Sequence, residues 1–223
     1  MGQGIIRTII LIALAVALLL AACGKPSSPT PSADAQTHLQ AGRDALEAKD
    51  YQGAVNELEQ AVRLDPTLSE AHFRLGNAYL QLKEYDKAEA SFRNALKIDP
   101  NDANSHANLG VTLYALDRLT EAEAEFRAGL KVTPDDAELH YLLAATLLQQ
   151  NRLDAAKAEL DKAIELKPDL PEAWFGLGVY YKLTGQKEEA IKAFEHFLEL
   201  PPAQDPQART EAERELRELK GTQ

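Results

Sequence analysis

Residues 69–102, SEAHFRLGNAYLQLKEYDKAEASFRNALKIDPND, carry the spacing that decides the fold. Apolar and small side chains recur at intervals of three or four residues, around Gly76 and Tyr79 and again around Ala88 and Phe92. This period is typical of amphipathic helices. A proline near the end of the stretch cannot continue the second helix. The segment therefore predicts two helices joined by a short turn.

The same spacing recurs with a constant shift of 34 residues and defines five consecutive units. The units are 35–68, 69–102, 103–136, 137–170 and 171–204. Each has Gly or Ala at its eighth position, Ala at its twentieth and Pro at its thirty-second. A lone helix of about 14 residues is marginal in water, so each unit needs its neighbours. We expect an all-α fold in which five helical hairpins stack into a solenoid.

The spacing has a physical reason. Small residues at positions eight and twenty let the two helices of a unit approach closely, and large residues at positions eleven and twenty-four fill the space beside that contact. Two residues depart from this pattern. Phe197 stands where a small residue is expected, so we expect it to pack against the segment after the last unit. Gly129 weakens a helix interior by roughly 1 kcal/mol relative to Ala.

Residues 205–223 follow the last unit and begin with Asp205-Pro206, which is typical of an N-cap and a first helical turn. We predict a helix from Pro206 to about Lys220, followed by a short tail. Its apolar residues are few, as expected for a helix that caps the end of a solenoid and faces water on its outer side.

Matched position by position, these spacings are those of the tetratricopeptide repeat (TPR), and the chain resembles proteins of this family over about residues 35–204. The resemblance implies a TPR superhelical solenoid of five helix-turn-helix repeats with a C-terminal capping helix. It also implies a scaffold that binds other proteins in a concave groove lined by the first helix of each unit, rather than an enzyme.

The groove residues that the resemblance implies are mainly apolar and aromatic. They are Arg43, Phe73, Asn77, Asn108, Val111, Tyr114, Tyr141, Leu148, Phe175 and Lys182. Such a stripe fits a partner's amphipathic helix or extended apolar segment. For Leu80 and Ala145, on the same stripe, a place in the core between units is an equally good interpretation. Glu138 and Leu142 stand where chaperone-binding members of the family have basic residues, which disfavours an acidic C-terminal peptide as the ligand.

The amino-terminal segment is predicted to lie outside the fold. Residues 1–22 contain one charge, Arg7, followed by an apolar run that ends in small residues, and this pattern is typical of an export signal. The run is short for a membrane-spanning helix. The sequence LAAC at residues 20–23 resembles the bacterial lipobox, which implies cleavage before Cys23 and lipid attachment to its thiol. The alternative is a free thiol beside an uncleaved anchor.

Residues 23–34 are then the lipidated Cys and a Pro/Ser-rich linker, whose composition keeps it solvated and semi-extended. Because one acyl chain binds a membrane only marginally, stable anchoring requires more than one. Gly24 follows the Cys, and by the sorting habit of such lipoproteins this implies the outer membrane, facing the periplasm. The inner membrane remains the other possibility.

No motif in the sequence predicts catalysis, a metal or another cofactor. It contains no Gly-rich phosphate loop, HExxH pair or nucleophile elbow. The formal net charge of -11 makes nucleic acid a poor partner. The carboxylates of two runs are interpreted as solvated helix faces. These runs are Glu121, Glu123 and Glu125, and Glu211, Glu213, Glu215 and Glu218.

Histidine recurs at one position of the repeat, but we interpret it as structural. His38, His72, His106 and His140 are spaced by 34 residues, and Trp174 takes the fifth place. Equivalent residues of neighbouring units lie about 10 Å apart, the distance between packed helices. Metal ligands lie about 2 Å from their ion, so two of these side chains cannot share one.

The complete layout predicts a membrane-anchored scaffold of the bacterial cell envelope. Lipobox, short linker and five repeats resemble the pilotin-type lipoproteins of type IV pilus biogenesis, which implies help with secretin assembly. The layout is also similar to adaptors for peptidoglycan-processing enzymes. A third interpretation is a structural envelope component that associates with itself through its stacked repeats.

Overall fold

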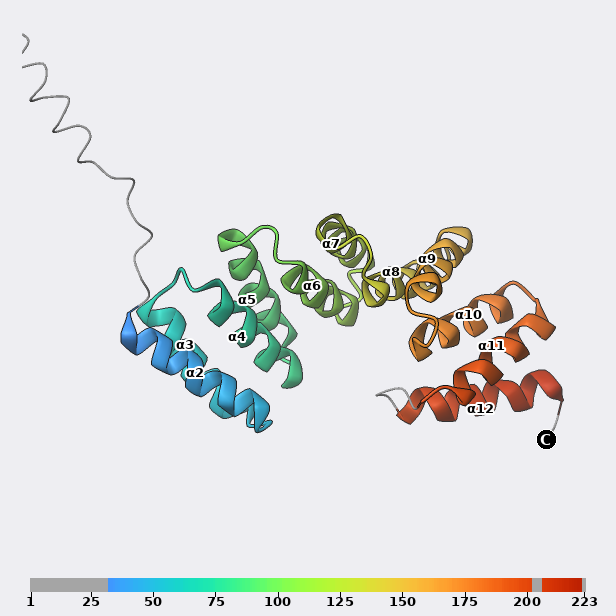
Figure 1. Cartoon of the computed structure of the whole chain (residues 1–223), viewed down its shortest axis with the longest axis horizontal. Helices are drawn as coiled ribbons and strands as arrows, with labels where there is room; N and C mark the ends of the chain where they lie inside the picture. Colours follow the sequence, from blue (N-terminus) through green and yellow to red (C-terminus); the bar gives the residue numbers. More distant parts are fainter. Residues whose placement is uncertain (1–31, 202–205, 222–223) are drawn as a thin grey trace, which may run out of the picture.

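The computed structural model describes residues 32–201 and 206–221, and this part of the chain contains eleven α-helices and no strand. Figure 1 shows them as an arch of helix pairs, with α2 near one end and α12 at the other. The helices are α2 (Ala33–Glu47), α3 (Tyr51–Leu64), α4 (Ser69–Gln81), α5 (Tyr85–Ile98), α6 (Ala103–Ala115), α7 (Leu119–Val132), α8 (Ala137–Gln149), α9 (Leu153–Leu166), α10 (Pro171–Leu183), α11 (Lys187–Glu199) and α12 (Pro206–Lys220). The predicted all-α solenoid is confirmed.

The curvature of the arch follows from which helices meet. The strongest contacts join the two helices of each pair, from α2 with α3 to α10 with α11. The first helices of successive pairs also contact one another, from α2 with α4 to α8 with α10, whereas the second helices make no comparable contacts among the described residues. The first helices therefore lie on the shorter, inner side of the arch, and the second helices spread apart on its outer side.

Glycine at the eighth position of a unit gives the closest approach within a pair. A Cβ atom on Gly76 would lie 2.6 Å from Cε1 of Phe92, and one on Gly110 would lie 2.5 Å from Cε1 of Phe126. Both rings are buried. The fourth unit has Ala144 at the same position and the smaller Leu160 opposite, both at 0% exposure. In these three units, position eight and position twenty-four therefore fill one shared volume. The first unit differs, because Gly42 there faces the smaller Leu58, with a Cβ distance of 2.5 Å to Cγ.

The turn inside each pair requires a left-handed residue at the fifteenth position of the unit. Four of the five are not glycine: Lys49, Lys83, Asp117 and Asn151 have φ between 58° and 60°. The fifth unit has Gly185, with φ of 74°. A left-handed conformation costs a residue with a Cβ about 1–2 kcal/mol, so most of these turns are held by the packing of the helices they join.

The last pair is closed by α12, as predicted. Phe197, the large residue at an otherwise small position, is buried in one cluster with Phe194, Ala212 and Leu216, which confirms that it packs against the segment after the last unit. Gly129, the other departure, is also a packing residue, because a Cβ there would lie 3.1 Å from Cδ1 of Leu139 in the next unit.

At the other end, α2 begins at Ala33, where the Ser32 hydroxyl accepts a hydrogen bond from the Ala35 amide at 3.1 Å. The helix thus includes the last two residues of the predicted linker. The predicted export signal, the lipobox and Cys23 lie outside the described residues. Among the helices that the structure describes, none combines the length and the apolar character that crossing a bilayer demands.

Candidate functional site

The predicted groove residues stand on the first helices, which form the inner side of the arch, and two of them are a pair of amides. Asn108 Nδ2 on α6 donates a hydrogen bond to Asn77 Oδ1 on α4 at 2.6 Å, and the pair is partly buried. One hydrogen of Asn108, both hydrogens of Asn77 and the Asn108 oxygen stay available after this bond forms. The pair therefore offers a donor and an acceptor side by side, which is the complement of a peptide group.

Apolar side chains surround the amide pair. Tyr114 on α6 is the most accessible of them, at 38% exposure. Burial of its ring raises the pKa of Tyr114, and the nearby Asp117 carboxylate raises it further, so the phenol stays protonated and neutral at physiological pH. Phe73 is half-buried, and its ring centroid lies 6.1 Å from that of Phe92.

Three more predicted residues serve both the core and the inner side. Val111, Tyr141 and Leu148 are each partly buried and pack against the buried clusters. The same is true of Leu80. We define the inner face as the seven predicted residues of the second, third and fourth units. They are Phe73, Asn77, Asn108, Val111, Tyr114, Tyr141 and Leu148. None of them carries a charge at neutral pH.

Charged residues lie at one end of the inner face. Arg43 on α2 is within 3.7 Å of the Glu70 carboxylate on α4, measured from Nε to Oε1. Arg74, one turn further along α4, binds the same oxygen at 2.8 Å. Arg43 is therefore placed at the end of the inner face but shares its carboxylate partner with a second arginine.

At the other end, the predicted residues of the fifth unit interact with α12 or with the cluster that it completes. Phe175 packs in the cluster formed with α12, and its ring centroid lies 5.4 Å from that of Phe197. Lys182 donates to the carboxylate of Glu215 on α12 and lies 3.9 Å from Glu218. Both residues are thus already engaged by the carboxyl-terminal part of the fold, although Lys182 stays exposed.

Several carboxylates interpreted as solvated have partners in the structure, and that part of the sequence analysis is wrong. Glu215 is 6% exposed and accepts hydrogen bonds from Lys182 and Arg214. Glu123 accepts hydrogen bonds from Arg127 and Arg152. Burial opposes the ionisation of both carboxyls, but their cationic partners outweigh it and lower each pKa.

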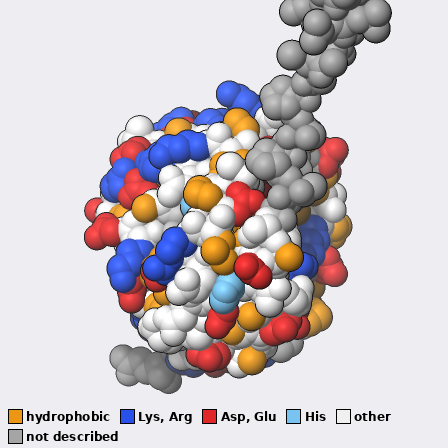
Figure 2. Space-filling view, turned by 90° about the vertical axis from the view of Figure 1, so that its left-hand side faces the viewer, with side chains coloured by type: hydrophobic (Ala, Val, Ile, Leu, Met, Phe, Trp, Pro, Cys, Tyr) orange, Lys and Arg blue, Asp and Glu red, His pale blue; other side chains and the backbone are white. Residues whose placement is uncertain are grey.

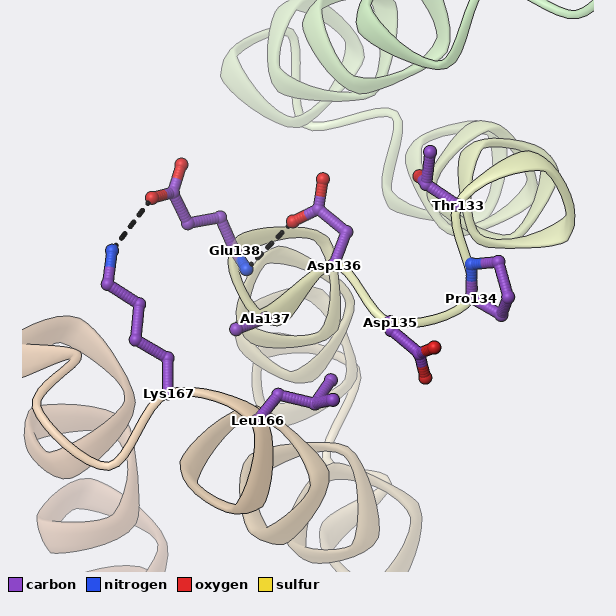
Figure 3. Close-up of a pocket in the computed structure, with 8 residues that line it drawn as sticks. All are labelled: Thr133, Pro134, Asp135, Asp136, Ala137, Glu138, Leu166 and Lys167. Atoms are coloured by element: carbon purple, nitrogen blue, oxygen red, sulfur yellow. Dashed lines mark hydrogen bonds and ion pairs between the residues drawn. The ribbon is translucent and has the colours of Figure 1, made fainter.

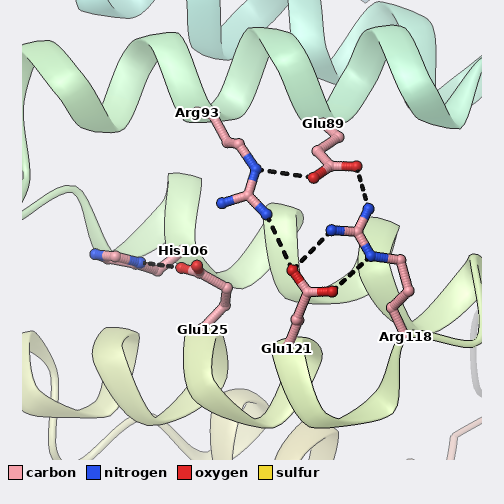
Figure 4. Close-up of polar contacts among 6 residues, drawn as sticks. All are labelled: Glu89, Arg93, His106, Arg118, Glu121 and Glu125. Atoms are coloured by element: carbon pink, nitrogen blue, oxygen red, sulfur yellow. Dashed lines mark hydrogen bonds and ion pairs between the residues drawn. The ribbon is translucent and has the colours of Figure 1, made fainter.

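Glutamates on the outer side also pair with arginines, as Figure 4 shows between α5 and α7. Arg118 binds both Glu89, at 2.5 Å, and Glu121, at 2.7 Å, and Arg93 reaches the same two carboxylates. Burial raises the pKa of Glu89, but the hydrogen bonds from Arg118 and Arg93 dominate and the net pKa is lowered. This network joins the second unit to the third.

The recurring histidines have structural partners. In three units Nδ1 of the histidine contacts a glutamate of the second helix, as Figure 4 shows for His106 and Glu125 at 2.7 Å. The other two pairs are His38 with Glu57 at 2.7 Å and His140 with Glu159 at 2.6 Å. Trp174 takes the fifth place and donates its Nε1 hydrogen to the Pro168 carbonyl at 2.7 Å. Within residues 32–201 and 206–221, no three His, Cys, Asp or Glu side chains are grouped to hold a metal ion.

A depression at the turn between α7 and α8 is a weaker candidate (Figure 3). Its polar groups are already used. Asp136 accepts hydrogen bonds from the backbone amides of Glu138 and Leu139 at 3.0 Å, and the Glu138 carboxylate accepts one from Lys167 at 3.2 Å. The polar residues of this depression therefore cap α8 and pair with each other, which makes it a weak candidate for a ligand site.

The amino-terminal end of the arch is also a poor candidate for a binding surface. In Figure 2, which views this end, acidic and basic side chains are interspersed and the hydrophobic ones are scattered between them. A stable interface between copies of a protein usually needs a more continuous apolar area. Stacking of copies through the part of this end that is visible in Figure 2 is therefore disfavoured.

Four family models match the sequence. Three described as "Tetratricopeptide repeat" match residues 69–102, 91–124 and 171–204, and one described as "TPR repeat" matches residues 42–83 and 146–185. Together they span residues 42–124 and 146–204, more than half of the chain. No curated protein matches the sequence.

Solved structures share the fold. PilW, described as a widely conserved type IV pilus biogenesis factor, is 26% identical with a TM-score of 0.69, and the match covers 85% of this chain and 94% of that one. For pilF of Pseudomonas aeruginosa the identity is 21%, the TM-score 0.70 and the coverage 85% and 88%. For YrrB, described as a TPR protein with an unusual peptide-binding site, the values are 20%, 0.66, 81% and 92%. Because 413 solved chains match, likeness of fold does not single out a pathway.

Proposed function

Because the chain belongs to the tetratricopeptide-repeat family, we propose that it is a scaffold whose inner face captures an apolar segment of another protein at the bacterial cell envelope. One observation carries this proposal. The inner face is uncharged and partly apolar, while Arg43 and Glu70 stand at one end of it and Lys182 and Glu215 at the other. Uncharged residues between charged ends favour an apolar segment that is short enough to lie between them.

The amide pair supports an extended segment over a helix. The N–H and C=O groups of a helical ligand are bonded to one another, so they have little use for Asn77 and Asn108. An extended segment presents peptide groups that need partners. The side chains of such a segment would alternate toward and away from Phe73 and Tyr114, and apolar residues at every second position suit that alternation.

Anchoring and pathway extend the proposal beyond the inner face. Lipid attachment at Cys23 would tether the arch to the outer membrane on the periplasmic side, with residues 24–31 as the spacer. The resemblance of LAAC to the lipobox supports this part. The resemblance of the lipobox, the linker and the five repeats to pilotin-type lipoproteins supports a role in type IV pilus or secretin assembly, and PilW and pilF share the fold.

Photo-crosslinking in living cells tests the inner face. A photoreactive amino acid at position 114 is expected to capture a partner protein, identified by mass spectrometry. Val132 is the matched control, because it is 39% exposed, close to the 38% of Tyr114, and stands at the end of an outer helix. Equal capture from both positions would refute the inner-face assignment, and adducts of the chain with itself would indicate self-association instead.

Substitutions at the same two positions give a second measurement. Tyr114→Asp is expected to abolish recovery of the crosslinked partner in pull-downs, while Val132→Asp leaves it unchanged. Helix content should stay the same in both variants, because neither side chain is buried. Lipid attachment is tested separately by labelling with a fatty acid, which Cys23→Ala should abolish.

A further inference from the structure

The second unit breaks the pairing of histidine with glutamate. Its histidine, His72, is oriented like those of the third and fourth units, because Nε2 lies 3.1 Å from the Pro66 carbonyl oxygen. His106 makes the same contact with Pro100 at 3.1 Å. The residue that should carry the carboxylate, however, is Ser91, whose hydroxyl donates to the Lys87 carbonyl oxygen at 2.9 Å. Among the described residues, Nδ1 of His72 has no hydrogen-bond partner.

A furrow opens where the carboxylate is missing. It lies on the outer side between α3 and α5, with residues of α4 as its floor. Arg63 from α3, His72 from α4, and Lys87, Ser91 and Asn94 from α5 line it. Its volume is about 500 Å³, which accommodates a side chain from another protein.

The charges around the furrow are predominantly positive. Arg63 makes no ion pair with any residue that the structure describes, and Lys97, beside His72, bonds only the neutral Asn94, at 3.1 Å. The only carboxylate that lines the furrow, Glu59, accepts a hydrogen bond from the Tyr79 hydroxyl at 2.6 Å. Lys87 binds Glu84 and lies over the Tyr79 ring. This concentration of cations is unusual in a chain with a net charge of -11.

Burial lowers the pKa of His72, the bond to the Pro66 carbonyl partly opposes that effect, and the charge of Lys97 lowers the pKa further. The unliganded ring therefore favours its neutral form. Since Nε2 faces the Pro66 carbonyl, it carries the hydrogen, and Nδ1 presents a lone pair to the furrow. A carboxylate bound at Nδ1 needs the doubly protonated ring, so its binding takes up a proton.

We propose that the furrow between α3 and α5 binds a carboxylate side chain of an acidic segment from another protein. The carboxylate would take the place beside His72 Nδ1 that Glu57, Glu125 and Glu159 fill in three other units. Arg63 and Lys97 would supply additional positive charge. This site lies on the outer side and is independent of the inner face.

The internal glutamates are the reason for choosing a carboxylate over other anions. Three times in this chain a carboxylate oxygen lies 2.6–2.7 Å from Nδ1 of the equivalent histidine. In two of these units, those of His106 and His140, Nε2 also contacts a proline carbonyl oxygen. The strong overall negative charge opposes an acidic partner at long range, so a short peptide should bind weakly and more tightly at low ionic strength.

The test uses acetylated tetraglutamate amide as the probe and the full chain as the receptor. Imidazole signals of His72 are followed by NMR in low salt, with His106 as the internal control. Tetraglutamate is expected to move the His72 signals, and tetraglutamine is not. Because the bound ring is doubly protonated, binding should tighten as the pH falls from about 8 to about 6.

Two substitutions at position 91 test whether the ligand binds at the place beside His72 where other units have a glutamate. Ser91→Glu supplies the missing carboxylate from within the chain, so it should weaken tetraglutamate binding about tenfold or more, roughly the effect of one charge-assisted hydrogen bond. Ser91→Ala adds no carboxylate, so this variant should bind tetraglutamate like the wild type. Both variants are expected to fold, since three units carry Glu at this position and Ala193 occupies it in the fifth.

Three results would overturn the proposal. The first is unchanged binding by Ser91→Glu. The second is an equal response of His106, which already has its carboxylate. The third is an equal response to inorganic phosphate at the same concentration, which would indicate a general anion site. Loss of crosslinking at position 114 bears on the inner face alone.

Discussion

Gly110 approaches Phe126 more closely than a residue with a Cβ atom allows. The added carbon would lie 2.5 Å from Cε1 of a ring that is 1% exposed, so Gly110→Ala forces the ring or the helix to move. Overpacking of this kind costs roughly 1–3 kcal/mol, and the better helix propensity of Ala returns about 1 kcal/mol. We expect a net loss of up to about 2 kcal/mol in the free energy of unfolding.

The fourth unit shows how the chain accommodates a Cβ at this position. There Ala144 faces Leu160 rather than a phenylalanine, and both are fully buried. Phe126→Leu alone leaves unfilled volume and should also destabilise. Combined with Gly110→Ala, it recreates the pairing of the fourth unit. The decrease in the free energy of unfolding of the double variant should therefore be at least about 1 kcal/mol smaller than the decreases of the two single variants added together.

Equilibrium unfolding in urea, followed by circular dichroism, measures these energies, and unchanged slopes confirm that the variants unfold in the same way. Gly129→Ala is the control in a similar helix interior. Its Cβ would meet the flexible end of Leu139 at 3.1 Å, so it should be neutral or stabilise by up to about 1 kcal/mol. Additive single losses, or a Gly110→Ala variant as stable as Gly129→Ala, would refute the shared-volume argument.

Three further predictions concern the outer network, the turns and α12. Arginine partners lower the pKa of Glu89, so that carboxylate stabilises the fold above the ordinary glutamate pKa and its contribution is lost as the pH falls through the lowered value. Glu89→Gln should therefore cost about 1–2 kcal/mol at pH 7 in urea titrations, and this cost should shrink as the pH is lowered into the acid range. Lys83→Gly should raise the thermal midpoint, because it removes the left-handed strain at φ of 60°, whereas Gly185→Ala should lower it. Ala212→Asp places a charge in the buried contact of α12. This variant should shift the fluorescence of Trp174, the one tryptophan, to longer wavelength. The control Glu213→Gln, on the exposed side of α12, should leave the fluorescence unchanged.

Much of the fold was predictable because its contacts are local. Gly76 and Phe92 stand in the same unit of 34 residues, and so do Gly110 and Phe126. A spacing within one unit is visible in the sequence, and its repetition predicted both the hairpins and their stacking. The inner positions of Asn77 and Asn108 were implied by the resemblance to the family, and only the structure shows that their amides bond to each other.

The sequence by itself thus determined the helices and their pairing, because these depend on periodicity along the chain. The resemblance to the family, and not the periodicity, implied which face each first helix turns inward. The tertiary structure alone decided which of those residues remain accessible. Phe175 and Lys182 repeat the inner pattern, yet Phe175 packs into the cluster formed with α12 and Lys182, although exposed, pairs with Glu215 of α12. Glu215 belongs to an acidic run, yet it is buried against Lys182. Burial and charge pairing depend on segments that meet only after folding, and no period in the chain encodes those distances.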